Sequence, residues 1–348
     1  MAIVIGCDMH TRFQQLAVVE TATGEVLEEL RLENEPLDGV RQFYARWPKT
    51  STVAVEAMGY LGWFAELMAE TGHQLVLGDA ARLRAMVVRK QKTDRNDALH
   101  LATVFCRGDF PRVWMPGPAE WETRHLLKHR HTLVKMRTQA KLAVQALALG
   151  RGIRLRQGLF TRAGRARLLA LALPPNETAR RDESLALVDE LGRRVRALDQ
   201  ALEERAQASA RATLLRTHPG VGPVTALAWV AMIGDVARFR SSGQLVSYVG
   251  LNPGEHSSGG RQKMGRISKQ GNPFLRRTLV EAGARAAQLE PALKRFYARK
   301  AVARSRSQAR VAVARKLAVR LYWMDKRSES YSVMWGDAHA DLPALVLA

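Results

Sequence analysis

The sequence predicts an α/β domain followed by a mostly helical region. The N-terminal third contains short runs that are apolar or that alternate between apolar and polar residues. Among them lie stretches whose apolar residues recur at helical spacing. The Pro- and Gly-rich segment RVWMPGPAEW, residues 112–121, then marks a boundary. After it come long stretches with apolar residues three and four positions apart. At 348 residues the chain is long enough for several domains, and we expect them at 1–112, 113–212, 213–300 and 301–348.

The elements of the N-terminal domain follow from these runs in order. AIVIGCD, QQLAVVET and VLEELRLE predict an antiparallel three-strand meander, with ATGE as the second turn. PLDGVRQFYARW predicts a helix, TVAVE a strand, GYLGWFAELMAETG a helix and QLVLG a strand. Residues 80–105 are predicted to be partly helical. The order β-β-β-α-β-α-β-α is that of the RNase H-like fold, whose metal site lies where the first and fourth strands end beside the last helix.

The middle of the chain predicts two long helices. Residues 122–150 are basic and helical in pattern, and a second helix is expected over about 183–212. The second helix carries a seam of apolar residues with charged flanks, the pattern of a coiled coil: Val188, Leu191, Val195, Leu198 and Leu202. Two interpretations remain open, an intramolecular helical hairpin and self-association through a coiled coil.

The last third begins with a helix, the turn PGVGPVTA and another helix, which matches a helix-hairpin-helix. Its glycines, Gly220 and Gly222, would let backbone N–H groups approach a DNA phosphate without reading bases. The alternative is an ordinary tight turn between helices. The polar loop HSSGGRQKMGRISKQGNP, the helix FLRRTLVEAGARAA and a basic helical segment at about 300–327 follow.

The charge of the chain predicts a polyanionic partner. Lys and Arg number 54 against 33 Asp and Glu, a formal net charge of +21, so we expect DNA or RNA binding that weakens steeply with salt. No apolar run of about 18 residues predicts a membrane span, and the start MAIVIGCDMH predicts a first strand rather than a signal peptide. Two cysteines without CxxC spacing make zinc ribbons and disulfide frameworks unlikely candidates. We therefore expect a protein of a reducing cytoplasm, with no membrane partner.

Four acidic residues of the N-terminal domain stand at informative positions. Asp8 ends the apolar run AIVIGCD and Glu56 ends STVAVE, while Asp94 and Asp97 lie in KTDRNDALHLA. Taken singly, an Asp at a strand end is more often a turn residue. Asp94 could likewise be a helix N-cap with Asp97 as its capping-box partner at the third helical position. Taken together they predict one site, because the two strands end side by side in this fold and residues three apart share a helix face.

Such a site consists of oxygen ligands, which suits Mg²⁺ or Mn²⁺ rather than zinc. Clustered carboxylates repel each other and need a compensating cation. Two divalent ions about 4 Å apart could stabilise the attacking and leaving oxygens of a phosphoryl transfer. A basic chain with such an acidic pocket predicts phosphodiester chemistry on nucleic acid.

Basic residues near two of these motifs are candidate nucleic-acid contacts. By themselves, the residues of HSSGGRQKMGRISKQGNP predict a flexible phosphate-binding loop, since serine is a poor nucleophile without a base or metal. The candidate cations are Lys90, Lys92 and Arg95 beside the acidic pair, and Arg261, Lys263, Arg266 and Lys269 in the loop.

These motifs together resemble the DEDD-type transposases of insertion sequences, a family of bridge-RNA-guided, serine-dependent DNA recombinases. The resemblance covers nearly the whole chain. It rests on GCDMH, AVEAMG and KTDRNDA, and on the blocks HPGVGPVTALAWVAMIGD and FRSSGQLVSYVGLNPGEHSSGGRQKMGRISKQGNPFLRRTLVEA. Three acidic motifs in the family's order together with these long blocks make the match specific.

The resemblance implies a RuvC-like N-terminal domain, a helical coiled-coil segment and a C-terminal transposase domain. The family's metal-binding tetrad matches Asp8, Glu56, Asp94 and Asp97 one for one. The family's reactive serine matches Ser258, with the neighbouring Ser257 left open. It would attack a DNA phosphate, form a transient phosphoserine and free a 3′ hydroxyl, on element ends and target DNA chosen by a guide RNA. The resemblance also implies dimers that pair into tetramers, for which the apolar seam is a candidate contact.

Two other functions fit the same residues. A RuvC-like nuclease would keep the acidic tetrad and cut branched DNA with water, which leaves Ser258 as a phosphate contact. A non-catalytic nucleic-acid-binding protein would carry the acidic site as a relic. A covalent protein–DNA adduct that depends on Ser258 separates the transposase from both.

Overall fold

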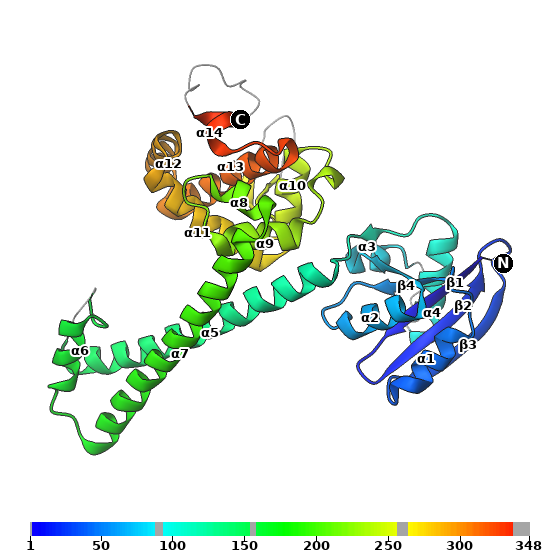
Figure 1. Cartoon of the computed structure of the whole chain (residues 1–348), viewed down its shortest axis with the longest axis horizontal. Coiled ribbons are helices and arrows are strands. Elements are labelled where there is room, and N and C mark those ends of the chain that lie inside the picture. Colours follow the sequence, from blue (N-terminus) through cyan, green and yellow to red (C-terminus); the bar gives the residue numbers. More distant parts are fainter. Residues whose placement is uncertain (1, 88–92, 154–157, 256–263, 337–348) are drawn as a thin grey trace. The chain divides into compact units, whose positions relative to one another are not determined.

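The computed structural model describes residues 2–87, 93–153, 158–255 and 264–336. Its contacts divide the chain into two compact units, Met1–Gly117 and Pro118–Ala348, which are described separately (Figure 1). Lys90, Lys92, Ser257, Ser258, Arg261 and Lys263 lie outside the described residues. Within the described residues, no helix is both long enough and apolar enough to cross a bilayer.

The first unit is a mixed sheet covered by helices on both faces. Its strands lie in the order β3-β2-β1-β4-β5-β6. β1, β4 and β5 run parallel, while β2 is antiparallel to β1 and to β3. The elements are β1 (Ile3–Met9), β2 (Phe13–Glu20), β3 (Val26–Glu33), α1 (Leu37–Ala45), β4 (Thr52–Glu56), α2 (Gly62–Thr71), β5 (Gln74–Gly78), α3 (Ala80–Ala85), α4 (Asp94–Cys106) and β6 (Arg112–Val113).

This arrangement confirms the α/β class and the predicted order of strands and helices up to residue 105. The short β6, which pairs antiparallel with β5, was not predicted, because two residues carry no alternation that a pattern can reveal.

The two faces of the sheet follow from the period of two along each strand. In β1, Ile5 and Cys7 point into a core formed with α1 and α2, whereas Val4 points into a core formed with α3 and α4. Cys7 is fully buried, as the apolar run around it predicts. Since Asp8 is an even step from Val4, it belongs to the α4 face of the sheet.

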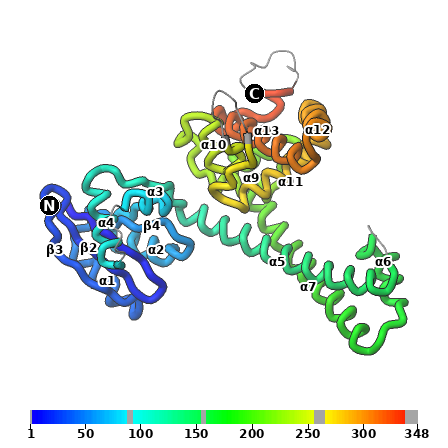
Figure 2. Tube along the Cα trace, turned by 180° about the vertical axis from the view of Figure 1, so that it is seen from behind, coloured from blue at the N-terminus to red at the C-terminus, as the bar shows by residue number. Residues whose placement is uncertain are grey.

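The second unit is almost entirely helical (Figure 2). The only strands in its described part are β7 (Pro253–Glu255) and β8 (Met264–Ile267), which pair with each other. Its helices are α5 (Pro118–Gly150), α6 (Arg162–Leu169), α7 (Pro175–Gln207), α8 (Ala210–Arg216), α9 (Pro223–Ile233), η1 (Val236–Arg238), α10 (Ser242–Val249), α11 (Pro273–Leu289), α12 (Pro291–Ala303), α13 (Arg306–Arg327) and α14 (Tyr331–Trp335).

Two helix boundaries differ from the prediction. The helix expected over about 183–212 is α7 followed by α8, and it starts earlier because Pro175 occupies the first helical turn, where proline is favoured. The basic segment expected at about 300–327 belongs to α12 and α13, which are separated at Arg304, and Ser305 caps the second of them.

α5 and α7 form an antiparallel hairpin held by apolar and ionic contacts. Arg130 Nε lies 2.5 Å from Asp199 Oδ1, and Arg151 pairs with Glu177 at 2.7 Å near the other end. The apolar seam of α7 is largely buried in this unit, where Leu191 and Val195 pack with Leu133 of α5. This packing favours the intramolecular hairpin of the two interpretations, and a contact between subunits through the seam stays a prediction. Helical spacing identifies an apolar stripe but not the partner that covers it.

Candidate metal centre

The site begins at the ends of two neighbouring parallel strands. In the register of β1 and β4, Cys7 pairs with Val55, so the next residues along each strand are Asp8 and Glu56. Both lie on the face of the sheet that α4 covers, because alternate residues of a strand share a face. Two carboxylates that are far apart in sequence are thus neighbours in space.

The third and fourth carboxylates come from the first turns of α4. Thr93 caps this helix, since its hydroxyl accepts a hydrogen bond from the N–H of Asn96 at 3.3 Å. Asp94 and Asp97 are therefore not the capping pair that the sequence left as an alternative. The positive end of the helix dipole lies at this terminus and favours carboxylates there.

A small cavity joins three of the four predicted ligands. Asp8, Glu56 and Asp97 line a space of about 270 Å³, together with Arg84 at the end of α3 and His100 one turn further along α4. Its remaining lining is apolar: Leu83, Val87 and Leu101. Strand ends and a helix start thus place three carboxylates around one space, with a cation at its edge.

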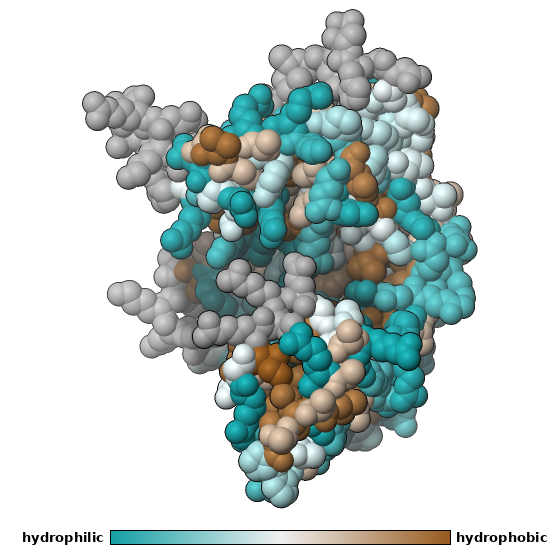
Figure 3. All heavy atoms as spheres, turned by 90° about the vertical axis from the view of Figure 1, so that its left-hand side faces the viewer, coloured by the Kyte–Doolittle hydropathy of each residue, from teal (hydrophilic) through white to brown (hydrophobic). Residues whose placement is uncertain are grey.

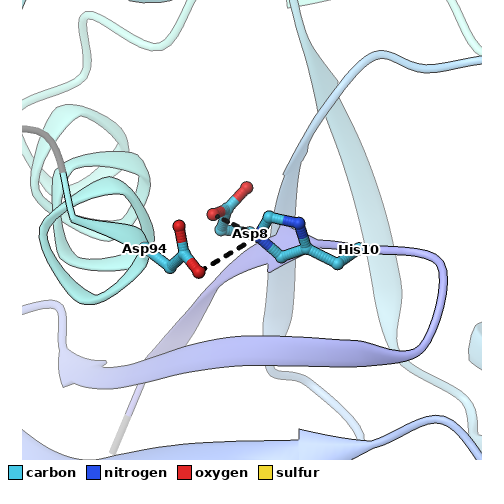
Figure 4. A group of neighbouring side chains, drawn as sticks. All are labelled: Asp8, His10 and Asp94. Atoms are coloured by element: carbon cyan, nitrogen blue, oxygen red, sulfur yellow. Dashed lines mark hydrogen bonds and ion pairs between the residues drawn. The ribbon is translucent and has the colours of Figure 1, made fainter.

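The fourth predicted ligand, Asp94, lies close to the same histidine, His10, as Asp8 does (Figure 4). Nε2 of His10 lies 3.1 Å from Oδ2 of Asp8 and 3.6 Å from Oδ2 of Asp94. One ligand atom from each of these three residues lies within 4.8 Å of the others. The structure therefore brings all four predicted acidic residues to one region and places beside them a histidine nitrogen that was not predicted.

The electrostatics of Asp8 indicate a site that favours a cation. Burial raises the pKa of Asp8 above its usual value, and the charges of Asp97 and Asp94 raise it further, while His10 acts in the opposite direction. A carboxyl group whose ionised form is disfavoured by burial and by like charges gains the most from a nearby cation. Carboxylate oxygens at this spacing are a donor set that fits a divalent ion.

Three residues of this region were missed in the sequence: His10, Arg84 and His100. His10 carried a usable signal, because it follows Asp8 by two positions and therefore shares its face of an extended chain. Arg84 carried none, since it lies in a basic stretch in which the pattern does not single out one cation. His100, whose Nε2 lies 3.3 Å from the Leu83 carbonyl, lies on the same side of α4 as Asp97.

Comparison with known proteins identifies the family. Residues 212–298 match the family described as "Transposase IS116/IS110/IS902 family", and residues 5–150 match a second transposase family, of the IS110 DEDD type. A probable family 20 transposase of Pseudomonas aeruginosa is 30% identical over 261 residues, which cover 71% of this chain and 74% of that protein. The chain belongs to the IS116/IS110/IS902 family of transposases.

Two further similarities of this transposase cover less of the chain. The transposase for insertion sequence element IS1111A of Coxiella burnetii is 42% identical over 88 residues, which are 25% of this chain and 24% of that protein. The T. thermophilus RuvC structure solved with a Holliday junction substrate covers 32% of this chain and all of its own, with 16% identity and a TM-score of 0.25. As a member of its family, the chain is an enzyme that cleaves and recombines DNA.

Five further predicted nucleic-acid contacts of the transposase lie within the described residues: Arg95 in the first unit, and Gly220, Gly222, Arg266 and Lys269 in the second. Nε of Arg95 donates a hydrogen bond to Glu29 Oε2 at 2.8 Å. Gly220, at a φ of +92°, packs so closely on α11 that a β-carbon would lie 2.5 Å from the amide nitrogen of Ala286. Gly222 precedes Pro223 as the residue before α9, and the exposed Arg266 and Lys269 follow the segment 256–263.

Proposed function

We propose that this transposase cleaves and exchanges DNA strands at specific sites by using a divalent-metal tetrad and a serine nucleophile, under the guidance of a structured RNA. One observation carries the proposal. Asp8, Glu56 and Asp97 line one cavity, and Asp94 lies beside them within reach of Asp8. Carboxylates from two strands and one helix start meet here although they are up to 89 positions apart in the sequence (97 − 8).

The donor set supports Mg²⁺, or Mn²⁺, as the ion. Asp8, Glu56, Asp94 and Asp97 would hold it through carboxylate oxygens, which are the ligands that these ions prefer. When bound, such ions neutralise the charge that develops on a phosphoryl group in transfer. The residues around the ligands complete the environment. The apolar side chains of Leu83 and Leu101 restrict water at one wall, and Arg84 offers a phosphate a guanidinium at the edge.

The proposed chemistry begins with Ser258, which the family resemblance supports. Its Oγ loses a proton and forms a bond to the DNA phosphorus while the bond from phosphorus to the 3′ oxygen breaks. The released 3′ oxygen takes up a proton and becomes a hydroxyl. The product is a 5′-phosphoserine link. The 3′ hydroxyl of another strand then reverses the reaction, which joins new partners and returns the serine. The number of phosphodiester bonds is conserved, so strand exchange requires no external energy source.

The basic charge of the chain supports the nucleic-acid partners. A net charge of +21 suits the phosphates of both a DNA target and a guide RNA, which would supply sequence choice by base pairing. Arg266 and Lys269 follow Ser258 in the sequence and are exposed, as phosphate contacts require. The turn with Gly220 and Gly222 is proposed as a further contact with the DNA backbone.

Assembly into dimers and tetramers is proposed through a different surface from the buried seam. Figure 3 shows brown apolar side chains exposed between teal polar ones on one face of the molecule. Leu142, Leu149, Leu169 and Leu187 of the α5–α7 hairpin region are each at least half exposed, at 50–56%. Exposed apolar side chains of this size are candidates for contacts between subunits.

A trapping experiment tests the proposed function. The purified transposase is incubated with its RNA, a DNA carrying the element end and Mg²⁺, then denatured and examined for a covalent protein–DNA adduct. The proposal expects an adduct that Ser258→Ala abolishes and that Ser257→Ala retains. Cleavage of branched DNA that survives Ser258→Ala would instead support a RuvC-like nuclease. Salt-sensitive binding without cleavage in the unaltered protein would support a non-catalytic role.

A further inference from the structure

His10 occupies a position at the acidic cluster that the tetrad does not account for. It follows Asp8 by two residues and therefore points to the same side of the chain. Its Nε2 faces both Asp8 and Asp94, at 3.1 and 3.6 Å (Figure 4). A single ring nitrogen thus lies close to two carboxylates that come from different elements of the fold.

The backbone of His10 is held on both sides. Its N–H donates to the carbonyl oxygen of Phe13 at 2.9 Å, and its own carbonyl oxygen accepts a hydrogen bond from the Asn34 side chain at 2.9 Å. These bonds fix the tight connection between β1 and β2. The Cα–Cβ direction of His10 is therefore set by the fold and not by a freely moving loop.

The ring itself is held by stacking. The imidazole lies 4.5 Å from the Phe13 ring at an interplanar angle of 23°, and the guanidinium of Arg31 lies 3.7 Å from the centroid of the same Phe13 ring. Aromatic stacking of this kind restrains the ring plane. A ligand whose orientation is restrained in advance loses less entropy when it binds an ion.

We infer that His10 is a further ligand of the metal centre and that its imidazole biases this centre toward Mn²⁺ over Mg²⁺. The inference rests on the proposed function, because it adds a nitrogen ligand to the proposed carboxylate tetrad. Mg²⁺ prefers oxygen ligands almost exclusively, whereas imidazole nitrogen suits transition metals, among which Mn²⁺ also accepts carboxylates. A histidine coordinates an ion through an unprotonated ring nitrogen, so Nε2 would carry no proton in the loaded site.

The test uses the full-length protein and the metal ions alone. Mn²⁺ and Mg²⁺ affinities are measured by calorimetry for the unaltered protein, His10→Gln and the control His129→Gln, an exposed histidine on α5. Pulsed electron paramagnetic resonance of bound Mn²⁺ then reports whether a ¹⁴N nucleus is directly coordinated. Thermal unfolding of each variant shows that it is folded, which is expected because the His10 side chain is 38% exposed.

We expect the ¹⁴N signal in the unaltered protein and in His129→Gln, and its loss in His10→Gln. It also expects Mn²⁺ affinity to fall by about tenfold or more in His10→Gln, with a much smaller fall for Mg²⁺. An unchanged signal, or an equal fall for both ions, overturns the role of His10. Asp8→Asn separates the two proposals. Mn²⁺ binding that survives this substitution overturns the metal centre as a whole, whereas binding lost in Asp8→Asn but unaffected by His10→Gln overturns only His10.

Discussion

Gly6 in β1 lies directly beneath the carbonyl oxygen of Ala98 in α4, so close that a β-carbon on Gly6 would lie 2.1 Å from that oxygen. Gly6 occupies the same face of β1 as Asp8, two residues before it. The missing side chain therefore lets α4 approach the strand and brings Asp94 and Asp97 to Asp8. The close approach is a requirement of the site as much as of the fold.

Gly6→Ala is expected to destabilise the protein by about 1–3 kcal/mol or more, because the added methyl forces α4 away from β1. The displacement should also weaken Mn²⁺ binding at the carboxylates. Urea unfolding measures the first effect and calorimetry the second. The control is Gly39→Ala in α1, where no atom lies within 4 Å of the added carbon. Equal unfolding midpoints for Gly6→Ala and the unaltered protein would show that α4 does not depend on this contact.

Arg84→Ala is expected to slow DNA cleavage by roughly tenfold or more, which corresponds to the loss of one charge-assisted hydrogen bond to a phosphate. Arg84 lines the cavity of the carboxylates. Arg82, two residues earlier in α3, does not line that cavity and provides a matched control. Cleavage rates at saturating DNA are compared for the two variants. Equal rates in Arg82→Ala and Arg84→Ala would remove Arg84 from the site.

His218 makes the stability of the second unit depend on pH. It is almost fully buried, and its Nδ1 donates to the carbonyl of Pro219 at 2.9 Å while Nε2 lies 3.5 Å from Nη1 of Arg320. Burial, and then the charge of Arg320, lower the pKa of His218 from 6.5 to about 4. Between pH 6.5 and about 4, His218 therefore binds a proton in the unfolded chain but not in the folded chain. The free energy of unfolding falls as the pH is lowered through this window.

His218→Gln is expected to remove this component, which amounts to at most about 3 kcal/mol because one pKa unit corresponds to about 1.36 kcal/mol. The measurement is the free energy of unfolding in urea at several pH values from 7 to 4 for both proteins. Other acidic groups contribute equally to both, so the difference in slope reports His218. Parallel pH profiles would mean that the histidine titrates alike in the folded and unfolded chains.

The alternation of side chains between the two faces of a strand explains why the acidic cluster was predictable. Asp8 and Glu56 each end an apolar run, and period-two alternation assigns them to one face once the strands are placed side by side. The spacing of Asp94 and Asp97 predicts a shared helix face. The N-cap Thr93 was overlooked because Asp94 is itself a good capping residue, and only the backbone shows which of the two is outside the helix.

Other features depend on packing that no local pattern records. The seam of α7 has the spacing of a subunit contact, yet Leu133 of α5 covers it, and the sequence carries no mark of that partner. The need for Gly6 arises from a helix about ninety positions later in the chain, at Ala98. The two-residue spacing from Asp8 places His10 on the same side of the chain, but a histidine just beyond a strand end is usually solvated, so the pattern alone does not single it out.

The most direct test of the acidic tetrad is strand transfer by Asp97→Asn and Asp8→Asn. Asparagine keeps the size of the side chain but removes the charge that holds a divalent ion. The control is Asp38→Asn, whose carboxylate is 81% exposed and pairs with Arg41 on the surface. We predict that both site variants lose strand transfer while binding the RNA and DNA as tightly as Asp38→Asn does. Strand transfer that persists in either site variant would contradict the assignment of these carboxylates as the catalytic metal ligands.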